Sequence, residues 1–496
     1  MPLKILNKLF FTIGIAIAFL PWQGYAQKYD PPIRIEIPVP SENNTCFLTP
    51  VDKNGIIILI DNHDEKTWNI VHYDTNFSVI TDKQITFNNK LNFCQDSYSN
   101  NIYCAAFQTY NTSASAYNCS FLCYNMSQKT INVYALSLRE KESICYMSQI
   151  DNIIVFSTIN NKNEEQVYLF DCASSICKKL DVCENSFSVE CIQTDTFNQC
   201  ILIGLIGYKA KYETYIKLLT INSSNQSIEN ERVINLNKKY FLSSLKLHIT
   251  DGQSYLLSGD YYLSNNMSAS EINRASTGIY SFAFNPQDEI KASYFDFTDI
   301  ENLSSYQKKI FTANTSHNHT SLLYADAGMQ ILATEFFSID YEQDMTTPMS
   351  MYYSGMYTNN MRISGYKYLN AVITTIQKDG SVKKCDIFNF NGLTLPRVTR
   401  ILNAYVDEQR LLVFFSYDGN IYSIVYEPQS STRPAQAERI ISSSNNDIIS
   451  KDYTSFCCHW YQNKFLCYGY QKIISRNSSR RNNNKIVFYA TKLIYE

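Results

Sequence analysis

The feature of this sequence that most limits its fold is a short pattern that recurs along most of its length. A strand-like apolar stretch is followed by a polar turn and then by a second strand-like stretch. Such stretches are rich in Ile, Val, Tyr and Phe and are too short for most helices, which is typical of β-hairpins. Nine first members can be read: GIIILID (55–61), NIYCAAF (101–107), NIIVFST (152–158), CILIGLI (200–206), SYLLSGD (254–260), SLLYADA (321–327), NAVITTI (370–376), LLVFFSY (411–417) and KFLCYGY (464–470).

The spacing of these hairpins averages about 50 residues, which lies in the range of propeller blades. A full unit can be read around Cys145, where four strand-like stretches follow one another: SICYMS (143–148), NIIVFST (152–158), VYLFDC (167–172) and ICKKLDV (176–182). Four antiparallel strands make one blade. The sequence therefore predicts an all-β chain, a β-propeller of seven or eight four-stranded blades with no amphipathic helix. One hairpin would then be an addition, and the closely spaced region 370–390 and 411–427 is the candidate.

The two ends of the chain also fit a propeller. IRIEIPV (33–39) is a strand-like stretch without a hairpin partner, and the sequence finishes on IVFYATKLIY (486–495). Because an N-terminal strand often completes the last blade of a propeller, we expect these two stretches to pair. The alternative is a series of tandem β-sandwich domains, which would show Greek-key crossovers instead of a steady hairpin period.

The first 26 residues have the layout of a secretory signal peptide. Lys4 and Lys8 precede an apolar run from Leu9 to Leu20, and Gly24-Tyr25-Ala26 offers small residues for cleavage. We predict a signal peptide at 1–26 and a single propeller domain at 27–496; an uncleaved N-terminal anchor is the alternative. Later apolar stretches are too short to span a membrane. The mature chain is therefore predicted to lack a membrane span and to be secreted, either extracellular or luminal.

Three cysteine pairs, nine or ten residues apart, flank polar and aromatic stretches. In each pair the first cysteine is expected to end one strand and the second to lie in the next strand, close enough for a disulfide. An oxidising compartment favours such bonds over buried thiols, and the zinc-site spacings are missing. The predicted disulfides are Cys94–Cys104, Cys191–Cys200 and Cys458–Cys467. Cys46 and Cys145 occupy the matching first position, and because 15 is odd, Cys385 or Cys457 could stay unpaired.

The sequence contains twelve Asn-x-Ser/Thr acceptor sites for N-glycans, most of them in expected turns. They begin at Asn43, Asn76, Asn111, Asn118, Asn125, Asn222, Asn225, Asn266, Asn302, Asn314, Asn318 and Asn477. Glycine is scarce at 15 residues, so Asn and Asp should supply the turns that need a positive φ. The net charge of −3 argues against a nucleic-acid partner.

Half of the ten methionines lie in MTTPMSMYYSGMYTNNM (345–361). Met and Tyr clusters are common at adaptable contact surfaces, so this segment is the predicted contact loop. A loop that packs over the blades, or a copper(I) site, would use the same residues. The residues named for contact are Met345, Met349, Met351, Tyr352, Tyr353, Met356 and Tyr357.

No catalytic, metal-binding or cofactor-binding residue is predicted. His317 and His319 could share one side of a strand as a metal pair, but no carboxylate lies close by in sequence. The acidic segments DNHDE (61–65) and SYDGN (416–420) are expected to be plain turns rather than calcium loops. The hydrolase patterns G-x-S-x-G and H-E-x-x-H are missing from the sequence.

These observations leave three functional hypotheses. The first is a secreted or cell-surface binding or structural protein that holds a protein or glycan with loops at one face of the propeller. The second is a secreted carbohydrate-active hydrolase, with a carboxylate pair in the central funnel. The third is a subunit of an extracellular assembly, joined through the odd cysteine. The first is favoured, since the sequence contains no catalytic pattern; the ligand and the oligomeric state are not specified.

Overall fold

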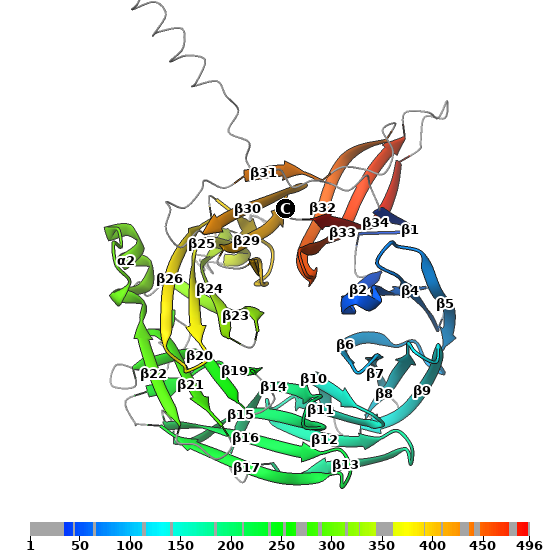
Figure 1. Ribbon diagram of the computed structural model, residues 1–496. Coiled ribbons are helices and arrows are strands. Elements are labelled where there is room, and N and C mark those ends of the chain that lie inside the picture. The colour runs from blue at the N-terminus through cyan, green and yellow to red at the C-terminus, as the bar shows by residue number, and fades with distance from the viewer. Residues whose placement is uncertain are drawn as a thin grey trace, which may run out of the picture. The chain divides into compact units, whose positions relative to one another are not determined.

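The fold is a β-propeller of eight four-stranded antiparallel blades, as the sequence predicts (Figure 1). It is seen in a computed structural model that describes residues 34–494 except for 43–44, 63–65, 112–115, 139–141, 183–185, 211–212, 237–239, 251–253, 264–274, 286–289, 313–315, 327, 344–360, 391, 408–409, 427–435, 441–446 and 476–483. The predicted signal peptide and contact loop lie outside the described residues. Within the residues described, no helix is long and apolar enough to cross a membrane.

Most blades consist of four strands that are consecutive in the sequence. The first four in chain order are β2 (Cys46–Pro50), β3 (Ile56–Asp61), β4 (Thr67–Tyr73) and β5 (Val79–Thr86); β6 (Asn92–Ser99), β7 (Ile102–Asn111), β8 (Ala116–Asn125) and β9 (Thr130–Leu138); β10 (Glu142–Ile150), β11 (Ile153–Asn160), β12 (Glu165–Asp171) and β13 (Ile176–Leu180); and β14 (Phe187–Asp195), β15 (Cys200–Ala210), β16 (Glu213–Asn222) and β17 (Ser227–Asn235).

The next two blades each contain a short extra strand. They are β18 (Tyr240–Leu242), β20 (Tyr255–Leu263), β21 (Gly278–Phe284) and β22 (Lys291–Asp296), with β19 (Lys246–Ile249) also paired to β20; and β23 (Ser316–Ala325), β24 (Met329–Gln343), β25 (Met361–Gln377) and β26 (Val382–Asn389), with β27 (Thr394–Leu395) on β25. The last two are β28 (Asn403–Asp407), β29 (Arg410–Tyr417), β30 (Asn420–Tyr426) and β31 (Gln436–Arg439); and β1 (Arg34–Val39), β34 (Asn484–Ile494), β33 (Lys464–Ser475) and β32 (Asp447–Tyr461).

Nine expected hairpins become eight blades because two of them belong to one sheet. The hairpin at 321–337 forms β23 and β24, and the hairpin at 370–390 forms β25 and β26. β24 and β25 then pair along their whole length, from Met329↔Gln377 to Gln343↔Met361. The region 411–427, in contrast, forms strands of a separate blade.

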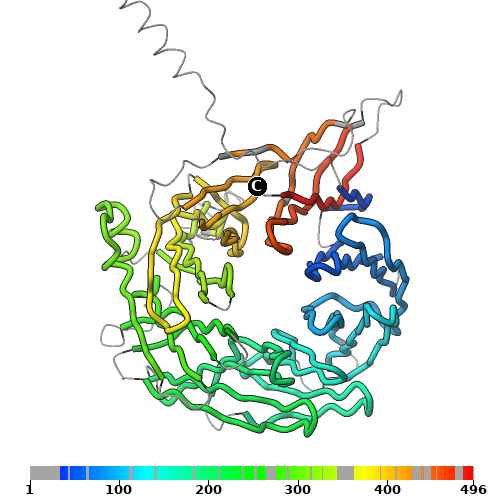
Figure 2. The backbone as a smooth tube through the Cα atoms, in the orientation of Figure 1, coloured from blue at the N-terminus to red at the C-terminus, as the bar shows by residue number. Residues whose placement is uncertain are grey.

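The chain divides into two compact units, which are described separately. The first unit contains the described part of Met1–Leu59 with Val71–Ile80 and Asp407–Glu496. Here β1 pairs with β34 from Arg34↔Thr491 to Val39↔Ile486, which confirms the predicted pairing of the two ends. Figure 2 shows the blue start of the described chain beside its red end.

Two aromatic side chains hold further parts of this first unit together. The buried Tyr470 hydroxyl accepts the N–H groups of Cys46 (2.8 Å) and Thr45 (3.1 Å). The indole Nε1 of Trp460 donates to the carbonyl of Gly55 at 2.9 Å, and its ring stacks on Phe77. The three hydrogen bonds join residues that lie more than 400 positions apart in the sequence.

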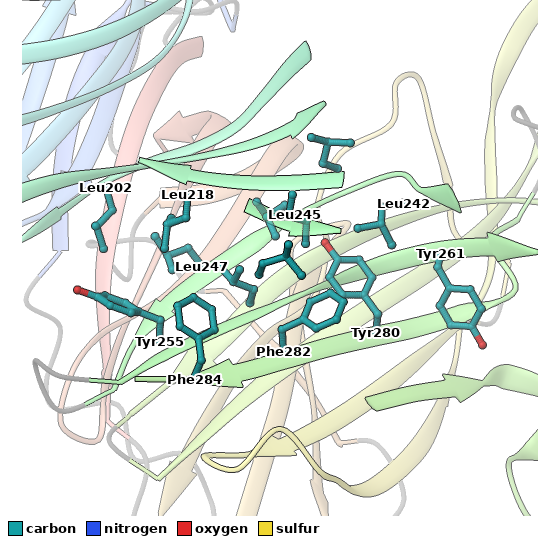
Figure 3. Close-up of a cluster of buried hydrophobic side chains, with 14 of the residues drawn as sticks. Leu202, Leu218, Leu242, Leu245, Leu247, Tyr255, Tyr261, Tyr280, Phe282 and Phe284 are labelled. Atoms are coloured by element: carbon teal, nitrogen blue, oxygen red, sulfur yellow. The ribbon is translucent and has the colours of Figure 1, made fainter. Parts of the chain in front are cut away.

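The second unit contains Ile60–Ile70 and Thr81–Val406, and its core lies between successive sheets. One cluster fills the space between the blade of β14–β17 and the blade of β18–β22. Figure 3 shows Leu202 and Leu218 of the first blade with Tyr255, Phe284 and Phe282 of the second. Central strands such as β15 are apolar on both faces because each face packs against another sheet.

Turns follow the expectation from the scarcity of glycine. Many residues with positive φ are Asn or Asp, such as Asn101 (φ 60°) and Asp151 (φ 49°). In the segment SYDGN, Asp418 (φ 48°) and Gly419 (φ 70°) form the two-residue turn between β29 and β30. This agrees with the plain-turn interpretation, since paired positive φ values are those of a type I′ hairpin turn.

The expectation of no helix is wrong for α2 (Ser305–Thr312). Its N-terminus has a capping box: the Gln307 N–H donates to Ser304 Oγ (3.2 Å), and the Ser304 N–H donates to Gln307 Oε1 (2.9 Å). Ile310 and Phe311 bury its apolar side in a core cluster. The helix has only eight residues, too few for a clear amphipathic period in the sequence.

Candidate functional site

Three consecutive blades carry a one-residue bulge in their first strand. The bulged residues are Cys94 in β6, Cys145 in β10 and Glu190 in β14, because the pairing skips each of them. A bulge turns a side chain away from the regular alternation of a strand, and bulges are over-represented next to functional sites. The bulge in the first strand of each of these blades is therefore a place where a polar side chain can point away from the core.

The side chain of Glu190 lies next to that of Glu165, the first residue of β12 in the preceding blade. The Ser188 hydroxyl oxygen is 2.9 Å from Glu190 Oε1 and 3.2 Å from Glu165 Oε1. The Oε1 atoms of the two glutamates can therefore be no farther apart than the sum of these two distances. The Val189 N–H also donates to Glu165 Oε2 at 2.7 Å, which fixes this side chain. We call this arrangement the Glu165–Glu190 pair.

The environment of the pair disfavours two negative charges. Burial raises the pKa of both carboxyl groups, and for Glu165 the adjacent Glu190 raises it further. Opposing effects come from the hydrogen bonds of Val189 and Ser188 and, for Glu190, from the Lys246 ammonium. Ser188 has one hydroxyl proton, so it can donate to only one carboxylate at a time. Glu165 also accepts the Val189 N–H, and a hydrogen bond from the Leu245 backbone favours the ionised form of Glu190.

Two tyrosines border the pair. Burial, and then the two glutamates, raise the pKa of Tyr146 and of Tyr208 to about 12, so both hydroxyls keep their protons at neutral pH. Tyr146 is 37% exposed, and both glutamates are half-buried. The pair is therefore reachable from solvent beside an exposed aromatic ring.

The thiols at the other two bulges extend this row of side chains. Burial and then Cys145 raise the pKa of Cys94 to about 12, and burial and then Glu165 raise the pKa of Cys145. The bulged residues occupy the equivalent place in the first strands of these successive blades. The row continues from Cys94 through Cys145 to the Glu165–Glu190 pair and Lys246.

Asp260 and Glu335 are two of the buried acidic residues of this unit, and both serve the structure. Asp260 of β20 accepts the Thr320 hydroxyl of β23 at 2.5 Å, which joins two blades, and burial raises its pKa to about 6. Glu335 of β24 accepts the N–H groups of Leu402 (2.7 Å) and Ile401 (3.1 Å), and burial raises its pKa to about 7. Neither carboxyl group is exposed to a ligand.

The three expected disulfides are not confirmed by the strand register. Cys104 lies opposite Ser97, Cys200 opposite Asp195, and Cys458 opposite Leu466. The prediction placed the first cysteine of each pair at the end of one strand and the second in the next strand. In the structure, Cys200 is the first residue of β15, whereas Cys191 lies four residues before the end of β14. Cys191 is therefore opposite Gly204 and not opposite Cys200. In the structure, Cys94, Cys104, Cys191, Cys200 and Cys467 are not bonded to their predicted partners.

The predicted contact residues between Met345 and Tyr357 lie outside the described residues, so that prediction remains open. Among the glycan acceptors, Asn76, Asn225 and Asn302 are exposed. Asn318, in contrast, uses its amide to contact Asp260 and the Ser276 N–H. The acceptors Asn43, Asn266, Asn314 and Asn477 lie outside the described part of the chain, as does the Asn111 side chain.

His317 and His319 occupy alternate positions of β23, so they share one side of the strand as expected. His317 stacks on Phe337, and burial lowers the pKa of His319. Across the part of the chain that the structure describes, no three His, Cys, Asp or Glu side chains are placed to share a metal ion.

Sequence reasoning missed the Glu165–Glu190 pair. Cys145 was aligned with Cys191, whereas the structure aligns it with Glu190, one residue earlier. A regular strand period gives no sign of a bulge. The one available signal was the recurrence of a polar or thiol residue at the same place in three first strands.

The chain matches no family model, and it matches no curated protein. Among solved structures it is similar to the β-propeller domain of the Trilobed protease from Pyrococcus furiosus, with 8% identity over 81% of this chain and 94% of that one and a TM-score of 0.37. It is also similar to the polysaccharide lyase Uly1, with 8% identity over 81% and 89% and a TM-score of 0.41. A prolyl endopeptidase is 7% identical over 97% of this chain but only 59% of its own, with a TM-score of 0.40. At such levels nothing about the activity of those proteins transfers to this chain.

Proposed function

We propose that this protein is a secreted binding protein that holds a glycan at the Glu165–Glu190 pair. The observation that supports this most is a pair of half-buried carboxyl groups that share one donor and lie beside the exposed ring of Tyr146. The proposal keeps the binding function favoured by the sequence. It moves the contact site from the segment 345–361, which stays a separate prediction, to described residues.

The chemistry of a sugar matches this site. A carboxylate has about four acceptor sites, and it accepts strong hydrogen bonds from hydroxyl groups. The protonated hydroxyls of Tyr146 and Tyr208 add donors, and an exposed tyrosine ring offers an apolar face to the C–H side of a sugar ring. A neutral, hydroxyl-rich ligand therefore fits better than an anionic one, which the two carboxylates would repel.

The direct test is binding of soluble neutral oligosaccharides to the purified full-length protein, measured by calorimetry after an array screen. Glu190→Gln removes one charged acceptor and should weaken binding roughly ten- to hundredfold. The matched control is Glu164→Gln, because Glu164 is the exposed neighbour of Glu165 and its carboxylate contacts Asn160 instead. Equal affinity of both variants, or no binding by the wild type, would overturn the proposal.

The second candidate is a carbohydrate-active hydrolase. It is favoured because Ser188 contacts both glutamates and so holds the two carboxyl groups close together. The contacts of 2.9 and 3.2 Å bring the carboxyl groups closer than the roughly 6.5–9.5 Å of inverting glycosidases. They fit the shorter separation of about 5–5.5 Å in retaining enzymes. Burial raises both pKa values, as a general acid requires.

Catalysis can be separated from binding by product analysis. The oligosaccharides that bind in the first experiment are incubated with the protein, and newly released reducing ends are measured. A hydrolase is established if the wild type releases reducing ends and both Glu165→Gln and Glu190→Gln fail to do so. The freshly formed anomer, followed by NMR, should then retain its configuration. Binding without any cleavage by the wild type would leave the binding function and exclude this candidate.

A further inference from the structure

Two pairs of cysteines lie directly opposite each other on neighbouring strands, and neither is a pair that the sequence suggests. Cys104 of β7 faces Cys123 of β8, and Cys457 of β32 faces Cys467 of β33. The first pair belongs to the second unit and the second pair to the first unit. Both pairs lie inside blades, away from the Glu165–Glu190 pair.

The geometry of these positions suits a covalent link. Residues directly opposite on antiparallel strands have Cα atoms about 4.5–5.5 Å apart, which lies within the range of about 4.4–6.8 Å that disulfides span. The Sγ atoms of Cys104 and Cys123 are 3.0 Å apart. This is only about 1 Å longer than a disulfide bond. A small rotation of the two side chains would close it.

The surroundings of Cys123 are mainly apolar. It lies in an apolar cluster with Phe121, Phe156 and Phe170. A third thiol, Cys172 from the following blade, also contacts it. Hydrogen bonding to Cys104 and then burial raise the pKa of Cys123, and burial and then Cys467 raise the pKa of Cys457. Since the thiolate is the reactive form, such thiols react slowly once they are buried.

We propose that the mature protein contains two disulfides, Cys104–Cys123 and Cys457–Cys467. Each forms during folding, before the sheets bury it. In each step the two thiols lose two protons and two electrons, and a sulfur–sulfur bond forms. The electrons pass to the disulfide of an oxidant, a thiol–disulfide oxidoreductase or a small-molecule disulfide, which is reduced to two thiols. The slow reactivity of the buried sulfurs then preserves the bonds.

The experiment is peptide mapping of the full-length chain, secreted from a eukaryotic host and blocked with N-ethylmaleimide under denaturing conditions. Chymotrypsin can cut after Phe107, Tyr110 and Tyr117 and so separates the first two cysteines; trypsin can cut after Lys464 and separates the second two. The expected result is a peptide containing Cys104 linked to one containing Cys123. In the second digest, a peptide containing Cys467 should be linked to the peptide that contains both Cys457 and Cys458.

Neighbouring cysteines provide matched controls. Cys123→Ser should leave Cys104 open to the maleimide, whereas Cys119→Ser should preserve the link, because Cys119 lies opposite Gln108. Cys457→Ser should likewise release Cys467. Cys458→Ser should leave that link intact, since its neighbour across the strands is Leu466.

The wild-type map decides the outcome even if a variant is not secreted. Maleimide on most copies of Cys104 or Cys467 would overturn the corresponding disulfide. So would a link from Cys104 to Cys94, or from Cys123 to Cys172. A link that survives Cys457→Ser but not Cys458→Ser would restore the pairing expected from the sequence.

Discussion

The buried carboxyl group of Glu335 makes a sharp prediction about stability and pH. Its side chain has no solvent exposure, and the positive charge that lowers its pKa is that of Arg400. Burial raises its pKa from 4.5 to about 7 because the ionised form loses its hydration, although the N–H groups of Leu402 and Ile401 lower it in part. The unfolded chain should ionise near the ordinary value.

Proton linkage gives the sign and the size of the pH dependence of the free energy of unfolding. Between pH 4.5 and about 7 the folded protein holds a proton that the unfolded chain has released, so its stability falls as the pH rises. The stabilisation that comes from the proton on Glu335 is fully present below pH 4.5 and is lost once the pH exceeds about 7. At about 1.4 kcal/mol for each pKa unit, the total is about 3 kcal/mol.

The perturbation is Glu335→Gln, which keeps the shape and an acceptor for Leu402 but removes the ionisable group. The free energy of unfolding is measured by urea titration with tryptophan fluorescence, below, within and above the pH window. The wild-type value minus the variant value should fall by about 3 kcal/mol across the window. His319, opposite Glu335 on β23, is present in both proteins, so its own titration cancels.

The control is Glu301→Gln, at an exposed position, which should leave the pH dependence of the wild type unchanged. If Glu335→Gln shows the same pH dependence as the wild type, the carboxyl group does not have a raised pKa. The assignment of Glu335 as a buried structural acid would then be wrong.

Three further changes have expected magnitudes. Tyr470→Phe leaves buried N–H groups, including that of Cys46, without an acceptor and should cost about 2–3 kcal/mol in urea unfolding; a loss below about 0.5 kcal/mol would contradict this. Gly259→Ala would place a Cβ 2.0 Å from a backbone oxygen and should cost about 3 kcal/mol or more by thermal unfolding, whereas Gly328→Ala, with nothing nearer than 3.5 Å, should be nearly neutral. If the proposed disulfide is present, Cys123→Ser should lower the free energy of unfolding by about 3 kcal/mol, measured against the wild type without reductant; no loss would count against the bond.

The hairpin pattern predicted the blades because alternation and turn residues are local. The strands β10 to β13 match four stretches read from the sequence around Cys145, and the pairing of β1 with β34 was also expected. The blade count was ambiguous because pairing between β24 and β25 depends on tertiary contact. Apolar patterns show which residues form strands, but they do not show which hairpins share a sheet.

The candidate site and the cysteine pairs could not be read from the sequence for a related reason. A bulge at Cys94 or Glu190 adds one residue to a strand and changes the residue opposite every later position. Cys457 and Cys458 are adjacent in sequence, yet one faces Cys467 and the other faces Leu466. Such one-residue shifts of the strand register depend on sheet twist and packing, and the amino-acid pattern of the strand does not show them.

The pairing of β1 with β34 has a consequence for synthesis of the chain. Glu36 and Lys485, which contact each other across these strands, are 449 residues apart. At about 5–20 residues per second, β1 waits roughly 20–90 s before its partner is made. An unpaired strand is a template for association with other chains, and charged residues and proline oppose such pairing. Arg34, Glu36 and Pro38 lie within β1, so the strand that waits longest carries residues that discourage pairing with the wrong chain.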